Sequence, residues 1–124
     1  MAYFMVFIGG GLGAALRHGV NIGSARLFGT SFPVGTLTVN VVGCLVMGLL
    51  AGYFAFKGDV GQHWRLFLTT GILGGFTTFS AFSLDVAALY ERGEPALAAG
   101  YIAASVILSL AAVFAGLALM RSLA

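Results

Sequence analysis

The composition of this 124-residue chain is typical of a protein embedded in lipid, since 60% of its residues are hydrophobic and 8% are charged. Its mean hydropathy of +1.03 is too high for a soluble domain, which needs a polar surface, and its net charge of +2 says little by itself. We therefore expect an integral membrane protein with no soluble domain and no secreted or nucleic-acid-binding function.

Charges and turn residues divide the chain into four apolar stretches, which are residues 2–28, 32–56, 64–90 and 95–120. Each reaches the roughly 20 residues that a helix needs to cross about 30 Å of hydrocarbon. Arg17 and His18 interrupt the first stretch, so its embedded part can end early. Because this stretch lacks a basic start and a small-residue cleavage site, we expect a first helix and not a signal peptide. The sequence predicts one all-α domain, 1–124, with four transmembrane helices.

Basic residues are balanced between the two sides of such a four-helix arrangement. The side of the termini holds Lys57, Arg65 and Arg121, and the other side holds Arg17, Arg26 and Arg92. The positive-inside rule therefore gives no orientation. A protein that inserts both ways up needs this balance, although the same count also arises when one loop dominates the orientation.

The second stretch carries a single amide at membrane depth. Thr36 and Asn40 are four residues apart, so they share one face of a helix. An amide buried in hydrocarbon must find hydrogen-bond partners, and two roles are open for Asn40. It either joins two helices or lines a polar path.

The third stretch has a weak helical centre. Its run Gly74-Gly75-Phe76-Thr77-Thr78-Phe79-Ser80 combines two glycines with two threonines, and both types disfavour a helix interior. As one helix, residues 64–90 would measure about 40 Å, longer than the hydrocarbon. We expect a break around residues 74–80, which is a candidate ion or substrate site because freed carbonyls need partners there. The alternative is a tilted helix whose threonines bond back to its own carbonyls.

The fourth stretch carries hydroxyl groups at helical spacing. Tyr101, Ser105 and Ser109 follow one another at intervals of four, so they form one stripe on an apolar helix. This stripe is either a hydrophilic track or a set of hydroxyls satisfied by their own helix.

Groups for enzyme chemistry are scarce in the sequence. No nucleophile–base pair and no His/Cys cluster with metal-ligand spacing is present, so we expect no enzyme. Asp85 is the only acid well inside an apolar stretch, and its role stays open. The single cysteine, Cys44, is interpreted as a small core residue.

Three motifs together resemble the Fluc fluoride channels, also called CrcB proteins. They are Gly35-Thr36-Leu37-Thr38-Val39-Asn40, the run Gly74-Gly75-Phe76-Thr77-Thr78-Phe79-Ser80-x-Phe82-Ser83, and the early Gly-Ala-x-x-Arg17 pattern. The resemblance covers all four stretches. It implies a dual-topology antiparallel homodimer in the cell (inner) membrane, surrounded by lipid, with two pores that export fluoride passively.

The resemblance also implies roles for individual residues. Phe79 and Phe82 would line the pores, Asn40 would donate from its amide near them, and Tyr101, Ser105 and Ser109 would form a hydroxyl track. A structural sodium ion would lie on the two-fold axis, held by the backbone carbonyls of Gly74 and Thr77 from both chains. Arg17, if it reaches the pore mouth, would raise the local anion concentration.

Two rival functions follow from the residues alone. A small multidrug exporter shares the size and the four spans, but the first stretch lacks the membrane glutamate of such exporters. A structural subunit of a larger membrane complex would not need a clustered polar track. Fluoride transport by this protein alone would separate the three functions.

Overall fold

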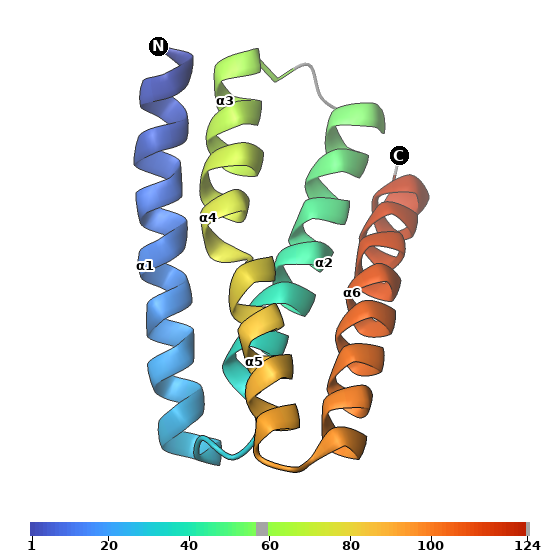
Figure 1. Cartoon of the computed structure of the whole chain (residues 1–124). Helices are drawn as coiled ribbons and strands as arrows, with labels where there is room; N and C mark the ends of the chain where they lie inside the picture. Colours follow the sequence, from blue (N-terminus) through green and yellow to red (C-terminus); the bar gives the residue numbers. More distant parts are fainter. Residues whose placement is uncertain (57–59, 124) are drawn as a thin grey trace.

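The computed structural model describes residues 1–56 and 60–123, and in this part of the chain every regular element is a helix (Figure 1). The elements are α1 (Ala2–Phe28), α2 (Val34–Phe56), α3 (Gln62–Leu66), the π-helix η1 (Phe67–Leu73), α4 (Gly74–Phe76), α5 (Phe79–Glu91) and α6 (Pro95–Leu123). They form a bundle in which the start of α1 and the end of α6 lie at the same end. The predicted all-α class is confirmed.

Three segments of the described chain are long and apolar enough to cross a membrane, namely Val34–Phe56, Gln62–Glu91 and Pro95–Leu123. Helix α1 is not among them, because Arg17, His18 and several glycines lower its hydropathy. The protein is therefore an integral membrane protein by composition and length, and a crossing by α1 stays a prediction.

Glycines allow the helices of the bundle to approach at backbone distance. A Cβ atom on Gly9 or Gly13 of α1 would collide with the backbone of η1, and one on Gly75 would collide with the backbone of Gly10. Gly48 of α2 and Gly116 of α6 meet each other's helix in the same way. Such contacts are the usual means by which apolar helices associate in lipid, since van der Waals packing replaces the hydrophobic effect there.

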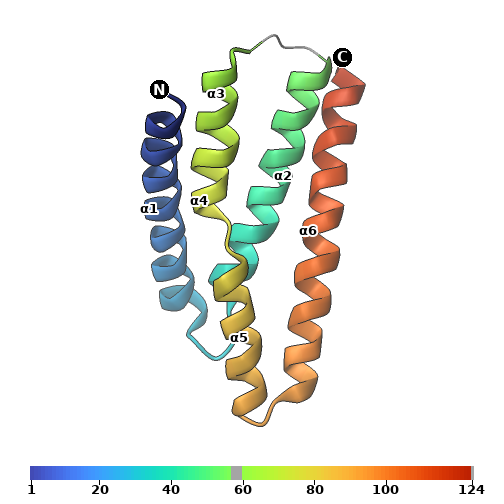
Figure 2. The ribbon, with the colours of Figure 1, turned by 45° about the horizontal axis from the view of Figure 1, so that its top comes forward.

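The helical run from α3 to α4 ends at Phe76, and α5 begins at Phe79. The two residues between them are extended, with φ −84° and ψ 160° at Thr77 and φ −155° and ψ 124° at Thr78. Thr78 caps α5, because its Oγ1 accepts a hydrogen bond from the backbone N–H of Ala81 at 3.2 Å. Figure 2 shows this non-helical link beside the middle of α2.

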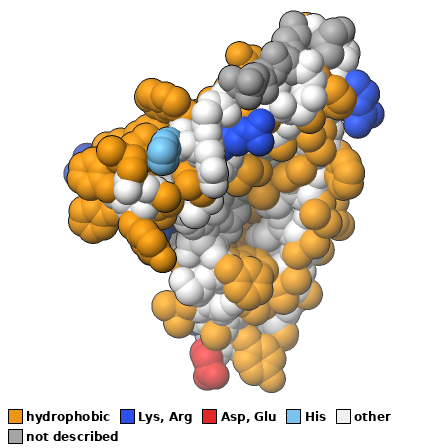
Figure 3. Space-filling view, turned by 90° about the horizontal axis from the view of Figure 1, so that it is seen from above, with side chains coloured by type: hydrophobic (Ala, Val, Ile, Leu, Met, Phe, Trp, Pro, Cys, Tyr) orange, Lys and Arg blue, Asp and Glu red, His pale blue; other side chains and the backbone are white. Residues whose placement is uncertain are grey.

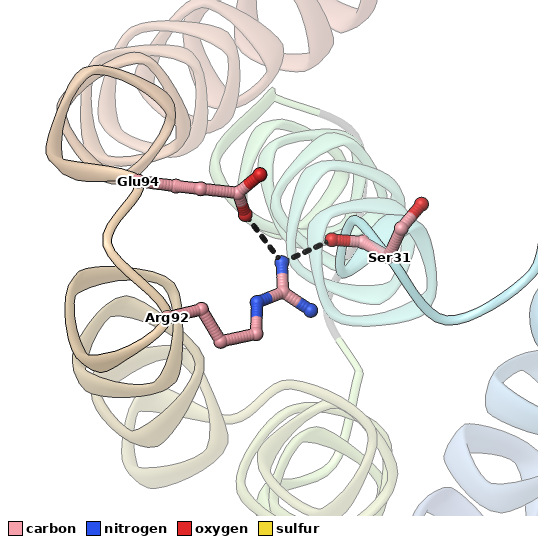
Figure 4. Close-up of polar contacts among 3 residues, drawn as sticks. All are labelled: Ser31, Arg92 and Glu94. Carbon is pink, nitrogen blue, oxygen red and sulfur yellow. Dashed lines mark hydrogen bonds and ion pairs between the residues drawn. The ribbon is translucent and has the colours of Figure 1, made fainter.

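Seen from above, the side chains of the bundle are mostly apolar, with a few basic side chains among them (Figure 3). Near the termini, the guanidinium of Arg65 lies 5.0 Å from the ring centre of Phe54. At the opposite end, Arg92 donates to the carbonyl of Ser31 and to Glu94 at 2.9 Å, which ties the loop before α2 to the turn before α6 (Figure 4). Because these groups are exposed, their ion pair contributes little stability.

Candidate functional site

The side chain of Asn40, on α2, makes two hydrogen bonds to the backbone of Thr78, one of the two extended residues between α4 and α5. Its Oδ1 accepts from the backbone N–H of Thr78 at 2.8 Å, and its Nδ2 donates to the carbonyl of Thr78 at 3.0 Å. An asparagine amide carries two N–H donors, and the second one has no partner among the described residues. Asn40 thus joins two elements and keeps one donor.

Three aromatic rings adjoin this link. The ring centres of Phe79 and Phe82 lie 5.5 Å apart, and those of Phe82 and Tyr101 lie 5.3 Å apart. Phe79 is 77% exposed, whereas Tyr101 is completely buried. The three rings therefore run from the surface of the chain into its core, and their polarised edges can face a polar ligand.

A groove of about 350 Å³ brings most of the predicted pore residues together. It is lined by Asn40, Cys44, Thr77, Thr78, Phe79, Phe82, Ser105, Val106, Ser109 and Leu110. Asn40 comes from α2, the rings from α5 and the serines from α6, so three helices that are far apart in sequence meet here. None of these lining residues carries a charge.

Ser105 is an unusual polar residue among those that line this groove. The residue is 6% exposed, and its Oγ has no hydrogen-bond partner in the described chain. A buried hydroxyl without a partner costs roughly 1–3 kcal/mol. Ser105 lines the groove through its other atoms, because its Oγ is buried and does not open into the groove.

Tyr101 lines the core side of the aromatic row and not the groove itself. Its hydroxyl donates to Asp85 Oδ2 at 3.1 Å. Asp85 lines a separate cavity of about 320 Å³, which also includes Asn21, Thr36 and Phe32. The hydrogen bond accounts for the one acid within an apolar stretch, and it holds that acid outside the groove.

The carbonyl groups around the link differ in their partners. The Gly75 carbonyl accepts from Arg17 Nε at 3.0 Å, so Arg17 contacts the link and does not line the groove. The carbonyl of Thr77, which lies outside the helices, accepts no hydrogen bond from the described residues, and no side chain of the described chain donates to the carbonyl of Gly74. They remain free to bind another group, which is costly in a water-poor region.

The sequence did not predict the contacts of three residues in this region. Thr78 binds Asn40 through its backbone, which leaves no signal in the sequence. Asp85 was noticed as an acid, but its partner depends on how α5 packs on α6. Cys44 was expected in the core, yet it is half-buried and lines the groove. Its spacing of four from Asn40 was the available signal.

Comparisons with known proteins agree with the sequence motifs. The family described as "CrcB-like protein, Camphor Resistance (CrcB)" matches residues 4–117. The chain is 63% identical, over 99% of its own length and 99% of theirs, to the fluoride-specific ion channel FluC 2 of Nitrobacter hamburgensis and to the fluoride-specific ion channel FluC of Rhodopseudomonas palustris strain BisB5. It is 60% identical over 94% of both chains to the fluoride-specific ion channel FluC of Methylobacterium nodulans.

Proposed function

The chain belongs to the CrcB-like family, whose members are ion channels and not enzymes, and on that premise we propose that it is a fluoride-selective channel. Fluoride moves passively down its electrochemical gradient and leaves the cell across the cell (inner) membrane. The observation that supports this most is the groove that joins Asn40, which keeps one amide N–H without a partner in the described chain, the rings of Phe79 and Phe82, and two serines of α6.

The chemistry of this groove suits a small, strongly hydrated anion. Fluoride gives up water only where other donors replace it, and hydroxyl and amide groups can do so. Ring edges carry partial positive charge and add weaker sites. A row of modest sites from Asn40 through Phe79 and Phe82 to Ser105 and Ser109 permits exit as well as entry.

The groove also lacks groups that would repel an anion. None of the described residues that line it is Asp or Glu. The carboxylate of Asp85 is bound to the hydroxyl of Tyr101 on the core side of the aromatic row. Tyr101 acts in this account as a positioning residue, since it packs against the ring of Phe82 and keeps the acid away from the path.

The channel is an antiparallel homodimer. The groove of each chain forms one pore, so the dimer has two pores. Phe79 is 77% exposed on the single chain, and a second copy would cover it. The balanced distribution of basic residues suits insertion in both orientations. Lipid surrounds the dimer. In each chain α1 is an additional membrane crossing, which makes four, and residues 62–91 form the third crossing, which is broken.

A structural sodium ion fits the centre of such a dimer. The carbonyl of Thr77 has no partner in the described chain, that of Gly74 lies beside it at the end of a helix, and hard cations prefer oxygen ligands. One chain offers two such oxygens, so a two-fold axis at the link would provide four. The ion would neutralise freed carbonyls and add positive charge near the anion path.

Liposomes that contain only the purified protein test the function. When a potassium ionophore relieves the charge build-up, vesicles loaded with fluoride should release it, and vesicles loaded with chloride should retain chloride. Equal release of both anions would remove the claim of selectivity. Release that requires a drug cation and a proton gradient would instead support the multidrug exporter.

A further inference from the structure

Gly43 of α2 faces the extended link at Thr77 and leaves room for the threonine side chain. The glycine is buried, and a Cβ atom added to it would overlap the methyl carbon Cγ2 of Thr77. The same Cβ would make ordinary contacts with the Phe76 ring at 3.5 Å and with the Thr77 Cβ at 3.8 Å. One methyl group therefore occupies the space that a side chain at position 43 would need.

Thr77 has little freedom to make room for such a side chain. Its backbone N–H and its Oγ1 both donate to the carbonyl of Leu73, at 3.0 Å each, so the branched side chain is held in one orientation. The next residue, Thr78, is held by Asn40 through two hydrogen bonds. A displacement of the Thr77 methyl group would break the bond to Leu73 or move the backbone of the link.

Asn40 and Gly43 are three residues apart, so they lie on one face of α2. Asn40 holds the link by hydrogen bonds, and Gly43 sets how closely the link approaches the helix. We propose that Gly43 is a positioning residue for the fluoride path, because the approach that it allows sets the place of Asn40 relative to Phe79 in the groove. This inference rests on the proposed function, since it takes the groove as the path of fluoride.

The collision at Gly43 can be removed from the other side of the contact. Its colliding atom is the Thr77 methyl carbon, which serine lacks. At Gly48, which also lies on α2, a Cβ would collide with the backbone of Val113, and no side-chain change removes that collision. Thr77→Ser should therefore rescue Gly43→Ala and should not rescue Gly48→Ala. Thr77→Val keeps the branched side chain and should rescue neither.

The experiment compares these single and double variants as full-length protein in liposomes. Fluoride efflux per folded protein, the half-saturating fluoride concentration and the melting temperature are measured for each variant. Gly43→Ala should lower efflux at least about tenfold and raise the half-saturating concentration, because groups that bind a ligand need placement within about 0.5 Å. With Thr77→Ser added, both values should return to within about twofold of Thr77→Ser alone, since the remaining effects add. Gly48→Ala, outside the groove, should lower the melting temperature and keep the wild-type half-saturating concentration.

The inference is overturned if Gly43→Ala conducts like the wild type, or if it loses folded protein while its half-saturating concentration stays unchanged. It is also overturned if Thr77→Ser does not restore efflux, including the case in which neither the single nor the double variant folds. If Gly43→Ala alone does not fold, a folded and conducting double variant supports the inference. Failure of the proposed function would look different, since the wild type would then release no fluoride. The melting temperatures would still show whether positions 43 and 77 are coupled.

Discussion

The side chain of Asn40 holds the backbone of Thr78 by both its N–H and its carbonyl, at 2.8 Å and 3.0 Å. This pairing resembles the contact between two strands, and it fixes two extended residues beside the middle of α2. Helix joining and donation to a ligand are therefore compatible roles for Asn40, because the pairing uses only one of its two N–H groups.

Asn40→Asp should abolish fluoride efflux. The carboxylate can still accept from the Thr78 N–H, but it cannot donate to the Thr78 carbonyl, and it adds a negative charge to the groove. The lost hydrogen bond should lower the free energy of unfolding by about 1–3 kcal/mol. The matched control is Asn21→Asp on α1, outside the groove, which should retain efflux. Normal efflux by Asn40→Asp would leave only the helix-joining role.

Phe79→Ile and Phe82→Ile should each reduce fluoride efflux, since isoleucine keeps an apolar side chain but has no polarised ring edge. The two variants should differ in stability. Phe79 is 77% exposed in the single chain, whereas Phe82 packs on Tyr101, so only Phe82→Ile should lower the melting temperature of the monomer. Phe114→Ile, at a residue that is 66% exposed and outside the groove, serves as the control. If both groove variants conduct like the wild type, the rings merely pack.

Ser105→Ala should have opposite effects on stability and on transport. Removing a buried hydroxyl that has no partner should leave the free energy of unfolding unchanged or raise it by about 1 kcal/mol. Fluoride efflux should nevertheless fall, because a donor of the path is lost. Thermal unfolding and efflux of the same preparation check both signs, with Ser83→Ala outside the groove as the comparison. Lower stability together with unchanged efflux would refute this role of Ser105.

Gly74 and Thr77 should influence the dimer through their backbone. A Cβ on Gly74 would meet only the Thr69 carbonyl at 3.7 Å, so Gly74→Leu should be tolerated by the single chain and should weaken dimer assembly. Thr77→Ser keeps the backbone carbonyl and should be mild, at about 1 kcal/mol for the lost methyl group. Dimer fraction in sodium and in N-methylglucamine, measured by cross-linking, checks the prediction. A dimer fraction independent of sodium would contradict the proposed site.

Gly75→Ala is the contrasting variant for Gly74→Leu. Its Cβ would collide with the backbone of Gly10, so it should disturb the packing of α1 on α4 within one chain. Gly75→Ala should therefore lower the stability of the single chain, and any loss of dimer should follow from that loss of stability. If Gly75→Ala and Gly74→Leu behave alike in both assays, the distinction between intrachain packing and dimer assembly is wrong.

The hydrophobic pattern predicted the all-α class and most helix limits. The first apolar stretch, 2–28, coincides with α1, because an apolar helix continues until turn residues end it. The π-helix Phe67–Leu73 was not predicted, since no residue preference distinguishes it from an α-helix. The family prediction is confirmed by the match over residues 4–117.

Partners across the bundle could not be read from the sequence. Arg17 was expected at a pore mouth, and the structure places its Nε 3.0 Å from the Gly75 carbonyl. That contact depends on the close approach of α1 to α4, which the glycines permit but do not specify. The role of Asp85 stayed open for the same reason, since its Tyr101 partner is sixteen positions away in the sequence and on another helix.

The central claim is that this chain forms a passive path that accepts fluoride and excludes chloride. The most direct test is the reversal potential of the purified protein in a planar bilayer, with fluoride on one side and an equal concentration of chloride on the other. The account predicts a large reversal potential with the sign expected when fluoride permeates and chloride does not. When the fluoride concentration is changed, the reversal potential should shift with the fluoride gradient. A reversal potential near zero, or one that follows chloride, would contradict the account.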